Sequence, residues 1–350
     1  MAEAPLIPLR VDSIVDEVPG FRSIRFAPGH GIAYKAGQFL TLVRRFGSAD
    51  LRRSYSITSS PLLGDALSIG VQRIANGTFS RYLHDELRVG DVLPCTGASG
   101  LFCLPEDPSA VPRFFFLAAG SGITPVWSLL RTVLYGTPAA AVLVYSTHDP
   151  SVSVFREGLK ALQAAFPQRF VLHELFSTDP DLSRARLTRD RLLGLLRADG
   201  GDLARTLFYT CGPESYLRFC SFLLRERGVP PAHIRREDFI ADRTLPARAV
   251  PPDTGTYTAR LYLYGTRHEV TVRYPDTILN AALRQGIVLP YSCATGRCGA
   301  CAARCTKGTV WLAHNEVLTP ADLAEGLTLT CTGHPVGGDV ELYFNNGPTS

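Results

Sequence analysis

The pattern of apolar and polar positions changes twice along the chain and so divides it into three parts. In residues 7–104, short apolar runs such as 39–43 and 67–71 are separated by turns that carry Gly, Pro, Asn and Asp. Runs of this length between turn residues predict strands of a small antiparallel barrel. We therefore expect residues 1–107 to form an antiparallel β-barrel domain.

In the second part, apolar runs of strand length alternate with segments of helical periodicity. Residues 113–118 and 141–145 are almost wholly apolar, which is typical of strands buried on both faces. Helices are expected after the first of them, up to about residue 135, and again over 214–227. This alternation predicts an α/β domain over residues 108–240, with a parallel sheet and helices on both of its faces.

The third part begins after a segment with little apolar pattern. Residues 241–256 include Pro246, Pro251 and Pro252 and are expected to form an extended linker. The following residues predict a hairpin of two strands, 257–264 and 268–274, and then a helix over about 277–284. We expect residues 257–350 to form a separate α+β domain.

Net charge and apolar composition limit the classes of partner and the location that we expect for this protein. The net charge of +4 on 350 residues is spread thinly and suggests no nucleic-acid partner. The N-terminus lacks the basic start and long apolar run of a signal peptide. The most apolar stretch, 114–130, is interrupted by Gly, Ser, Thr and Pro, so no integral membrane segment is expected. These features favour a cytoplasmic protein, in which cysteines serve metals or redox chemistry.

The most informative motif is a group of four cysteines. Cys293, Cys298 and Cys301 have C-x4-C-x2-C spacing, and Cys331 lies further along the chain. Three thiolates from one loop and one from a distant segment are the plant-type arrangement for a [2Fe–2S] cluster. A zinc site or four structural cysteines are the alternatives, but zinc favours paired C-x2-C motifs and only one such pair occurs here. Cys305 is one of the five cysteines outside this group, and it could replace a lost ligand.

Two motifs in the first part contain residue types that a flavin nucleotide requires. Arg53-Ser54-Tyr55-Ser56 combines a cation for the pyrophosphate, an aromatic face and a hydroxyl group. Gly77-Thr78-Phe79-Ser80 is a glycine turn that opens a helix, where backbone amides can bind phosphate. Each motif alone also arises by chance.

Two further motifs lie at strand ends of the second part. Gly120-Ser-Gly122-Ile-Thr124-Pro125 follows a buried strand, and we expect Thr124 to be the N-cap and Pro125 the first helical residue. A strand, a glycine turn and a helix N-terminus together form a pyrophosphate site. Cys211-Gly212-Pro213 follows the last long strand of this domain.

Taken in this order, the motifs resemble the ferredoxin–NADP reductase family fused to a plant-type, β-grasp-like ferredoxin domain. The arrangement is similar to the reductase components of phenylacetyl-CoA epoxidase and 3-ketosteroid 9α-hydroxylase systems. The resemblance implies that Ser56 and Cys211 border the reacting atoms of flavin and nicotinamide. It implies that the cofactors contact Arg53, Ser54, Tyr55, Ser56, Val71, Arg73, Gly77, Thr78, Phe79, Ser80, Gly120, Gly122, Thr124, Pro125, Cys211, Gly212 and Pro213.

The resemblance also bears on which coenzymes are used. Residues 97–102 and 77–80 favour FAD over the FMN of dioxygenase reductases, which have the same order of domains. The strand at 141–145 is followed by Ser146-Thr-His148-Asp149 rather than the Asn-Arg that is frequent in the family. A missing arginine weakens a pocket for the 2′-phosphate of NADPH, although Arg184 and Arg186 could reach one. We therefore expect NADH slightly more than NADPH.

The order of the domains implies electron flow from NAD(P)H through FAD and a [2Fe–2S] cluster to a partner oxygenase, hydroxylase or desaturase. A self-contained NAD(P)H reductase of small acceptors is the main alternative, together with an FMN-containing dioxygenase reductase. A non-enzymatic redox sensor is a third, but the flavin and nucleotide motifs argue against it.

Overall fold

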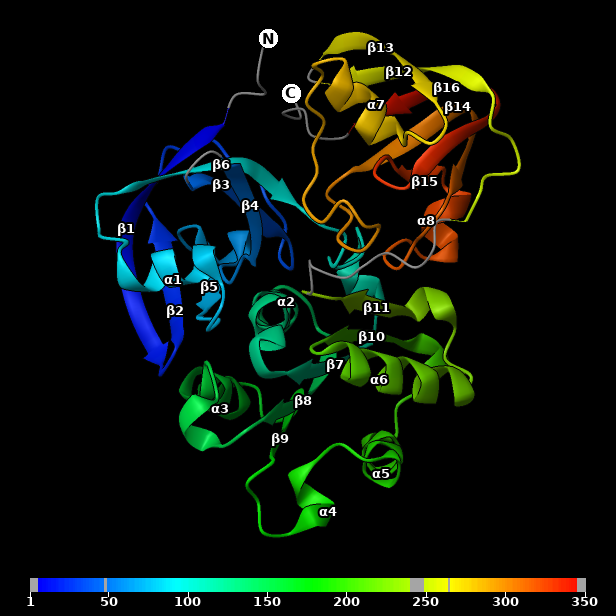
Figure 1. The fold of residues 1–350 in the computed structure, drawn as a ribbon. Coiled ribbons are helices and arrows are strands. Elements are labelled where there is room, and N and C mark those ends of the chain that lie inside the picture. The colour runs from blue at the N-terminus through cyan, green and yellow to red at the C-terminus, as the bar shows by residue number, and fades with distance from the viewer. Residues whose placement is uncertain (1–5, 47–48, 240–248, 264, 345–350) are drawn as a thin grey trace. The chain divides into compact units, whose positions relative to one another are not determined.

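The computed structural model describes residues 6–46, 49–239, 249–263 and 265–344 (Figure 1). Contacts within the chain group it into two compact units. One comprises Met1–Ile7, Ser99–Leu101 and Ile240–Ser350, and the other Pro8–Ala98 and Phe102–Phe239. Residues 241–248 of the predicted linker lie outside the described residues. No described helix is both long and apolar enough to cross a membrane.

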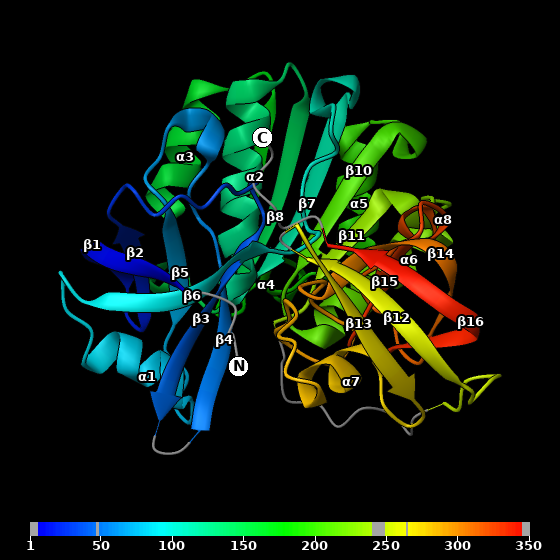
Figure 2. The ribbon, with the colours of Figure 1, turned by 90° about the horizontal axis from the view of Figure 1, so that it is seen from above.

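Six strands form the sheet of the N-terminal part, in the order β4-β3-β6-β1-β2-β5. The pairs β1–β2, β2–β5 and β3–β4 are antiparallel, and β3 and β4 run side by side in Figure 2. Helix α1, Thr78–Asp85, follows β5. This arrangement confirms the predicted antiparallel fold. The strands are β1 (Ile7–Val18), β2 (Phe21–Phe26), β3 (Phe39–Phe46), β4 (Ala49–Ser56), β5 (Ser68–Gln72) and β6 (Val92–Ser99).

The second sheet has five parallel strands in the order β11-β10-β7-β8-β9. The strands are β7 (Arg113–Ala119), β8 (Ala140–Thr147), β9 (Phe170–Phe176), β10 (Thr206–Cys211) and β11 (Ile234–Glu237). The helices are α2 (Ile123–Gly136), α3 (Arg156–Ala165), α4 (Leu182–Ala185), α5 (Arg189–Asp199) and α6 (Glu214–Glu226).

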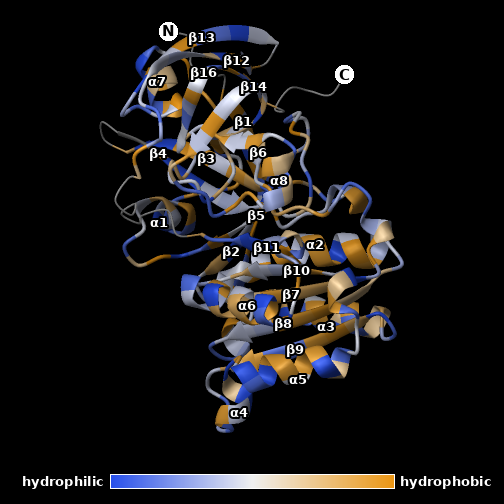
Figure 3. Ribbon diagram, turned by 90° about the vertical axis from the view of Figure 1, so that its right-hand side faces the viewer, coloured by the Kyte–Doolittle hydropathy of each residue, from blue (hydrophilic) through white to orange (hydrophobic). Residues whose placement is uncertain are grey.

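Both faces of this parallel sheet are buried. Phe114 and Phe116 of β7 share an apolar core with α2 and α3. Phe115 and Leu117, which point to the other face, share a second core with α5 and α6. Strands β7 and β8 are accordingly almost wholly hydrophobic (Figure 3). The predicted α/β architecture, with helices on both faces, is confirmed.

The C-terminal unit contains a mixed sheet in the order β13-β12-β16-β14-β15, and the first three strands are seen in this order in Figure 2. Only β12 and β16 pair in parallel among the described strand pairs of this sheet. Helix α7 shares a core with the sheet, so the predicted α+β fold is confirmed. The elements are β12 (Thr256–Leu263), β13 (Thr266–Arg273), α7 (Ile278–Arg284), β14 (Ala302–Leu312), α8 (Pro320–Ala324), β15 (Leu327–Leu329) and β16 (Gly333–Tyr343).

Candidate functional site

Strand β4 carries the aromatic residue assigned to the flavin. Arg53 and Tyr55 share one face of the strand because side chains alternate along it. The Tyr55 ring meets Phe79 of α1 edge to face, with 6.1 Å between ring centroids. Burial raises the pKa of the Tyr55 phenol well above its ordinary value, against the opposing effect of Arg53. Tyr55 is therefore neutral and offers an aromatic face beside a cation.

Ser54 and Ser56 lie on the opposite face of β4. The hydroxyl of Ser54 is hydrogen-bonded to Oγ1 of Thr41 on the neighbouring strand, at 2.9 Å. Ser56 is buried and is the last residue of the strand. A flavin ring that touches both Tyr55 and Ser56 must therefore lie at the end of β4.

The N-terminus of α1 has the glycine turn that the sequence predicts. Gly77 is the N-cap and provides no side chain to bind the first amides of the helix. Ser80 shapes the turn: its Oγ accepts from the amide of Ile74 (3.1 Å) and donates to the carbonyl of Gly77 (3.2 Å). Thr78 is exposed, whereas Phe79 is buried. The first turn of α1 thus combines amides without a side-chain cap with a buried aromatic anchor.

The two residues assigned to the ribityl chain are held in place by α1. Arg73 forms two hydrogen bonds to the carboxylate of Asp85, at 3.2 and 2.9 Å. Val71 is buried on β5, and its carbonyl lies 3.0 Å from Nε2 of His84. The guanidinium of Arg73 is therefore already paired, so contact with a ribityl chain uses donors that Asp85 leaves free.

The nucleotide loop differs from the prediction in where its helix begins. Gly120–Gly122 forms a 3-10 turn that continues into α2, with Gly122 as the N-cap. Thr124 is not the N-cap: its Oγ1 donates to the carbonyl of Ser121 at 2.8 Å. Pro125 accordingly lies within the first turn of α2 and not at its first position. The prediction failed because glycines can adopt helical angles before the first residue with a capping side chain.

The two nucleotide motifs of the parallel sheet lie in contact. A Cβ atom at Gly122 would collide with the carbonyl of Cys211, and one at Gly212 would lie 2.9 Å from Cβ of Ala119. Pro213 then forms the N-cap of α6. Glycine is needed at position 122 because the backbone of the β10–α6 turn leaves no room for a side chain. The loops after β7 and β10 thus form one continuous backbone surface beyond the strand ends, where ligands bind in open α/β sheets.

Cys211 lies beside a buried carboxyl group that the sequence analysis did not select. Cys211 of β10 pairs with Glu237 of β11. Both residues are buried, and burial raises the pKa of the Cys211 thiol well above its ordinary value. Burial also raises the pKa of Glu237, to about 8, and its Oε2 has no hydrogen-bond partner among the described residues. A protonated thiol is suited to bordering a cofactor, not to acting as a nucleophile.

The flavin barrel and the nucleotide loop meet at Thr124. A Cβ atom at Gly70 of β5 would lie 2.6 Å from Cγ2 of Thr124 and 3.2 Å from Cγ2 of Thr58. Gly70 directly precedes Val71, and Thr58 follows β4 by two residues. Thr124 therefore joins the two predicted cofactor regions within one compact unit.

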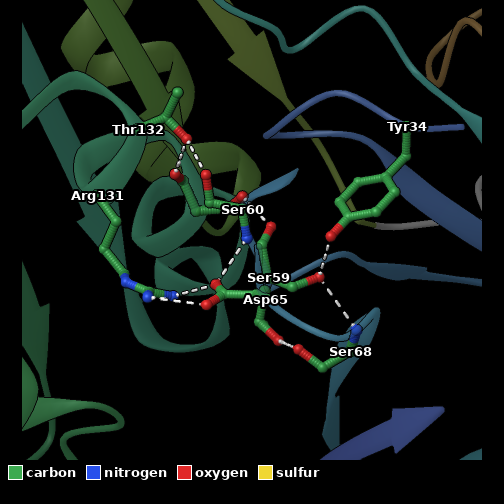
Figure 4. Close-up of polar contacts among 9 residues, drawn as sticks. Tyr34, Ser59, Ser60, Asp65, Ser68, Arg131 and Thr132 are labelled. Carbon is green, nitrogen blue, oxygen red and sulfur yellow. Dashed lines mark hydrogen bonds and ion pairs between the residues drawn. The ribbon is translucent and has the colours of Figure 1, made fainter. Parts of the chain in front are cut away.

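A set of polar contacts fixes the same junction, and Figure 4 shows five of its residues, Ser59, Ser60, Asp65, Arg131 and Thr132. Together with Ser128, we call these residues the barrel–α2 polar cluster. Arg131 of α2 donates twice to Asp65, at 2.6 and 3.2 Å, and Asp65 also accepts from the amide of Ser60 at 2.9 Å. Ser128 donates to the carbonyl of Ser59 at 2.6 Å. The segment that follows the flavin strand is thereby tied to the helix that follows the nucleotide loop.

A cavity of about 820 Å³ lies next to this cluster. Thr58, Ser59, Asp65 and Arg131 line it, together with Trp127. None of the residues predicted to contact FAD or the nucleotide is among its lining residues. The cavity is therefore distinct from the cofactor positions that the motifs predict.

The end of β8 bears on coenzyme choice. The carboxylate of Asp149 accepts from the amide (2.8 Å) and the hydroxyl (2.5 Å) of Ser151 and so caps a 3-10 turn. Arg184 lies 3.9 Å from Asp179 and is exposed, as is Arg186. Both arginines are solvated, and only Arg184 is placed near a carboxylate, so they do not form a buried phosphate pocket.

The four predicted ligands converge in the C-terminal unit. Cys293, Cys298 and Cys301 lie between α7 and β14, and Cys331 follows β15. Hydrogen bonds from Cys298 and Cys331 lower the pKa of Cys293, and the bond with Cys331 lowers that of Cys301. The same bonds raise the pKa values of Cys298 and Cys331. The four thiols therefore lie close enough to shift one another's pKa, and four cysteine thiols are a donor set suited to a [2Fe–2S] cluster.

The backbone of this loop depends on glycine at two positions. Gly296 and Gly299 have positive φ angles of 78° and 72°. A Cβ atom at Gly296 would lie 2.7 Å from the carbonyl oxygen of His314. The second ligand segment is tied to the loop through Thr330, whose amide and hydroxyl both donate to the carbonyl of Cys301 at 3.2 Å.

All four proposed ligands are cysteines, the donor type that holds [2Fe–2S] clusters. Within the described part of the chain, no three His, Cys, Asp or Glu side chains are placed to hold a single ion. A binuclear cluster divides its four thiolates between two irons, so it does not require them to converge on one point. The thiol of Cys305 lies 3.3 Å from the carbonyl oxygen of Lys307, to which it donates.

Three family models match the chain in the predicted order. They describe an oxidoreductase FAD-binding domain over residues 13–103, an oxidoreductase NAD-binding domain over 116–221 and a 2Fe-2S iron-sulfur cluster binding domain over 261–336.

Relatives match over nearly the full length. The ferredoxin reductase component of 3-ketosteroid-9-alpha-monooxygenase from Mycolicibacterium smegmatis is 33% identical, over 99% of this chain and 100% of that protein. A component of 1,2-phenylacetyl-CoA epoxidase from Escherichia coli is also 33% identical, over 89% of each chain.

Solved structures show the same fold. Phthalate dioxygenase reductase has a TM-score of 0.60 at 22% identity and covers 97% of this chain and 98% of its own. A type IV self-sufficient cytochrome P450 monooxygenase has a TM-score of 0.69 at 23% identity, over 98% of this chain and 42% of its own. With the sequence relatives, these matches show that the chain belongs to the family of FAD- and [2Fe–2S]-containing NAD(P)H oxidoreductases that serve as reductase components of multicomponent oxygenases.

Proposed function

We propose that this protein takes electrons from NADH through FAD and delivers them one at a time, through a [2Fe–2S] cluster, to a partner oxygenase, hydroxylase or desaturase. The hydrogen bonds of Thr330 to the carbonyl of Cys301, which join the cysteine loop to the segment of Cys331 in the same chain as the flavin and nucleotide motifs, carry the proposal. FAD supplies the step from a two-electron donor to single electrons. A reductase of small acceptors needs no cluster, so the cluster site favours a protein acceptor.

In this proposal, each group of residues has one task. Cys293, Cys298, Cys301 and Cys331 bind the cluster. The flavin is held by β4 and by the first turn of α1, where Tyr55 supplies an aromatic face and the amides after Gly77 bind phosphate. Ser56 and Cys211 border the reacting atoms, and the loops Gly120–Pro125 and Cys211–Pro213 hold the nicotinamide nucleotide. The contact of Gly122 with the Cys211 carbonyl supports the last assignment because it places both loops at one site.

NADH is the coenzyme that the end of β8 supports. Asp149 is engaged in a 3-10 turn, and Arg184 and Arg186 are exposed, so neither arginine forms a buried site for a 2′-phosphate. We also propose domain limits of 1–107, 108–240 and 257–350, joined by a linker over 241–256, with the three matching family models in support. A cytoplasmic location is proposed because cluster thiolates require a reducing compartment.

Replacement of one ligand separates the two halves of the electron path. We expect Cys331→Ser to lose the visible and EPR spectra of the cluster and to retain NADH-dependent reduction of ferricyanide, which accepts electrons from the flavin. Cys305→Ser is the matched control and should keep the cluster. Normal cluster spectra in a Cys305→Ser/Cys331→Ser double variant, in which Cys305 cannot replace the lost ligand, would contradict the ligand assignment. High turnover with quinones or ferric chelates in Cys331→Ser and wild type alike would favour a reductase of small acceptors.

A further inference from the structure

A buried guanidinium lies within the loop that carries three of the proposed ligands. Arg297 directly precedes Cys298, and only 6% of its side chain is exposed. Arginine is rarely buried to this extent because removal of a charge from water is costly. A cation in this position therefore calls for a role beyond solubility.

The charge of Arg297 is only partly neutralised. Its Nε lies 3.4 Å from Oε2 of Glu316, yet Nε and Nη1 have no hydrogen-bond partner among the described residues. The other oxygen of Glu316, Oε1, lies 2.9 Å from Nε2 of His314. The carboxylate is thus divided between the guanidinium and the imidazole. A buried charge with incomplete pairing acts on its surroundings with little screening.

Backbone contacts hold this charged group against both ligand segments. The amide of Glu316 donates to the carbonyl of Gly296, at 3.0 Å, within the cysteine loop. The hydroxyl of Thr332, the residue after Cys331, donates to the carbonyl of His314 at 2.8 Å. The amide of Ala313 donates to the carbonyl of Thr332 at 2.9 Å. Arg297 and Glu316 therefore occupy fixed positions next to the proposed cluster site.

We propose that Arg297 raises the reduction potential of the cluster and that Glu316 lowers it, so that this pair sets how readily the cluster accepts an electron. The inference rests on the four-cysteine ligand set of the proposed function. The electron comes from reduced FAD, no bond forms or breaks, and the cluster gains one negative charge. A nearby buried cation stabilises the more negative reduced form, and a carboxylate destabilises it.

Potentiometric titration of the holoprotein, followed by EPR of the reduced cluster, tests whether Arg297 and Glu316 shift the reduction potential of the cluster. At a fixed potential, Arg297→Gln should lower the ratio of reduced to oxidised cluster about tenfold, which is a shift of about 59 mV for one electron. Glu316→Gln should raise the ratio by a similar factor. Arg297→Lys keeps the charge and should stay within about threefold of wild type.

The opposite signs distinguish an electrostatic role from a structural one. If the pair only held the loop in place, loss of either partner would loosen the same loop and would not shift the potential in opposite directions. Shifts in the same direction, or an unchanged potential in Glu316→Gln, would overturn the inference. If Arg297→Gln does not retain its cluster, the reduction potentials of Glu316→Gln and Arg297→Lys still test the inference. Iron and sulfide are measured per chain alongside: their absence from wild type would refute the ligand set itself, and with it the inference.

Discussion

Glu237 makes the stability of the fold sensitive to pH. Its carboxyl group is buried at the end of β11, and desolvation raises its pKa from 4.5 to about 8. Below pH 4.5 the group is protonated in the folded and the unfolded chain, so burial has no ionic cost. Between pH 4.5 and about 8 the unfolded chain is ionised whereas the folded chain keeps its proton, so stability falls as the pH rises and levels off above the folded pKa.

We expect Glu237→Gln to remove this dependence. The gain in stability over wild type should be small at pH 5 and should grow up to about pH 8, with an upper limit of about 5 kcal/mol, and it should be seen as a rise in Tm. Calorimetry of both proteins across this pH range measures the difference. A gap in Tm that is the same at pH 5 and pH 9 would show that the carboxyl group does not titrate as its burial implies.

At the scale of single residues, the spacing of the cysteines along the chain predicted the cluster ligands. The sequence did not show which ionisable side chains are buried. The four cysteine ligands were predicted because their spacing is a local property of the chain. The burial of the Arg297 guanidinium and of the Glu237 carboxyl group could not be predicted in the same way. Arg297 is covered by the segment around Glu316, which follows it by many residues, and Glu237 is buried because β11 adds to the edge of a sheet.

At the scale of elements, apolar runs predicted strands better than capping residues predicted helix ends. The apolar run 113–118 corresponds to β7, Arg113–Ala119, and the expected helix over about 277–284 to α7, Ile278–Arg284. The start of α2 was wrong because Gly120–Gly122 adopts helical turns ahead of Thr124. The reason is tertiary: Gly122 must approach the carbonyl of Cys211, and this contact is not visible in the local sequence.

The junction between β4 and α2 yields a prediction at this scale. Asp65→Ala removes both bonds to Arg131 and the bond from the amide of Ser60. We expect a loss of about 1–3 kcal/mol in stability and about tenfold slower flavin reduction at saturating NADH, since small displacements of reacting groups are costly. FAD content should be unchanged. Stopped-flow absorbance measures the rate.

Glu157→Ala is the matched control for this experiment. Glu157 pairs with Lys160 at the surface, and 83% of its side chain is exposed. Exposed pairs of this kind contribute little, so the rate and the Tm should stay close to wild type. A rate in Asp65→Ala that equals that of the control would show that the barrel–α2 polar cluster does not position the two cofactors.

At the scale of the whole molecule, the order of motifs predicted the family. Each predicted cofactor site lies in its own fold: flavin motifs on the antiparallel sheet, nucleotide motifs at the ends of parallel strands, and cysteines in the mixed α+β unit. The full-length match to reductase components agrees with this division. The acceptor could not be predicted, because its recognition depends on surface residues for which the chain provides no spacing pattern.

Anaerobic titration of the purified wild-type protein with NADH, followed by absorbance and EPR, tests whether electrons pass from NADH through FAD to the cluster. We expect that the flavin bleaches, that the EPR signal of a reduced [2Fe–2S] cluster appears, and that each chain takes up about three electrons, two in FAD and one in the cluster. Uptake of only about two electrons, with a bleached flavin and no cluster signal, would contradict this electron path.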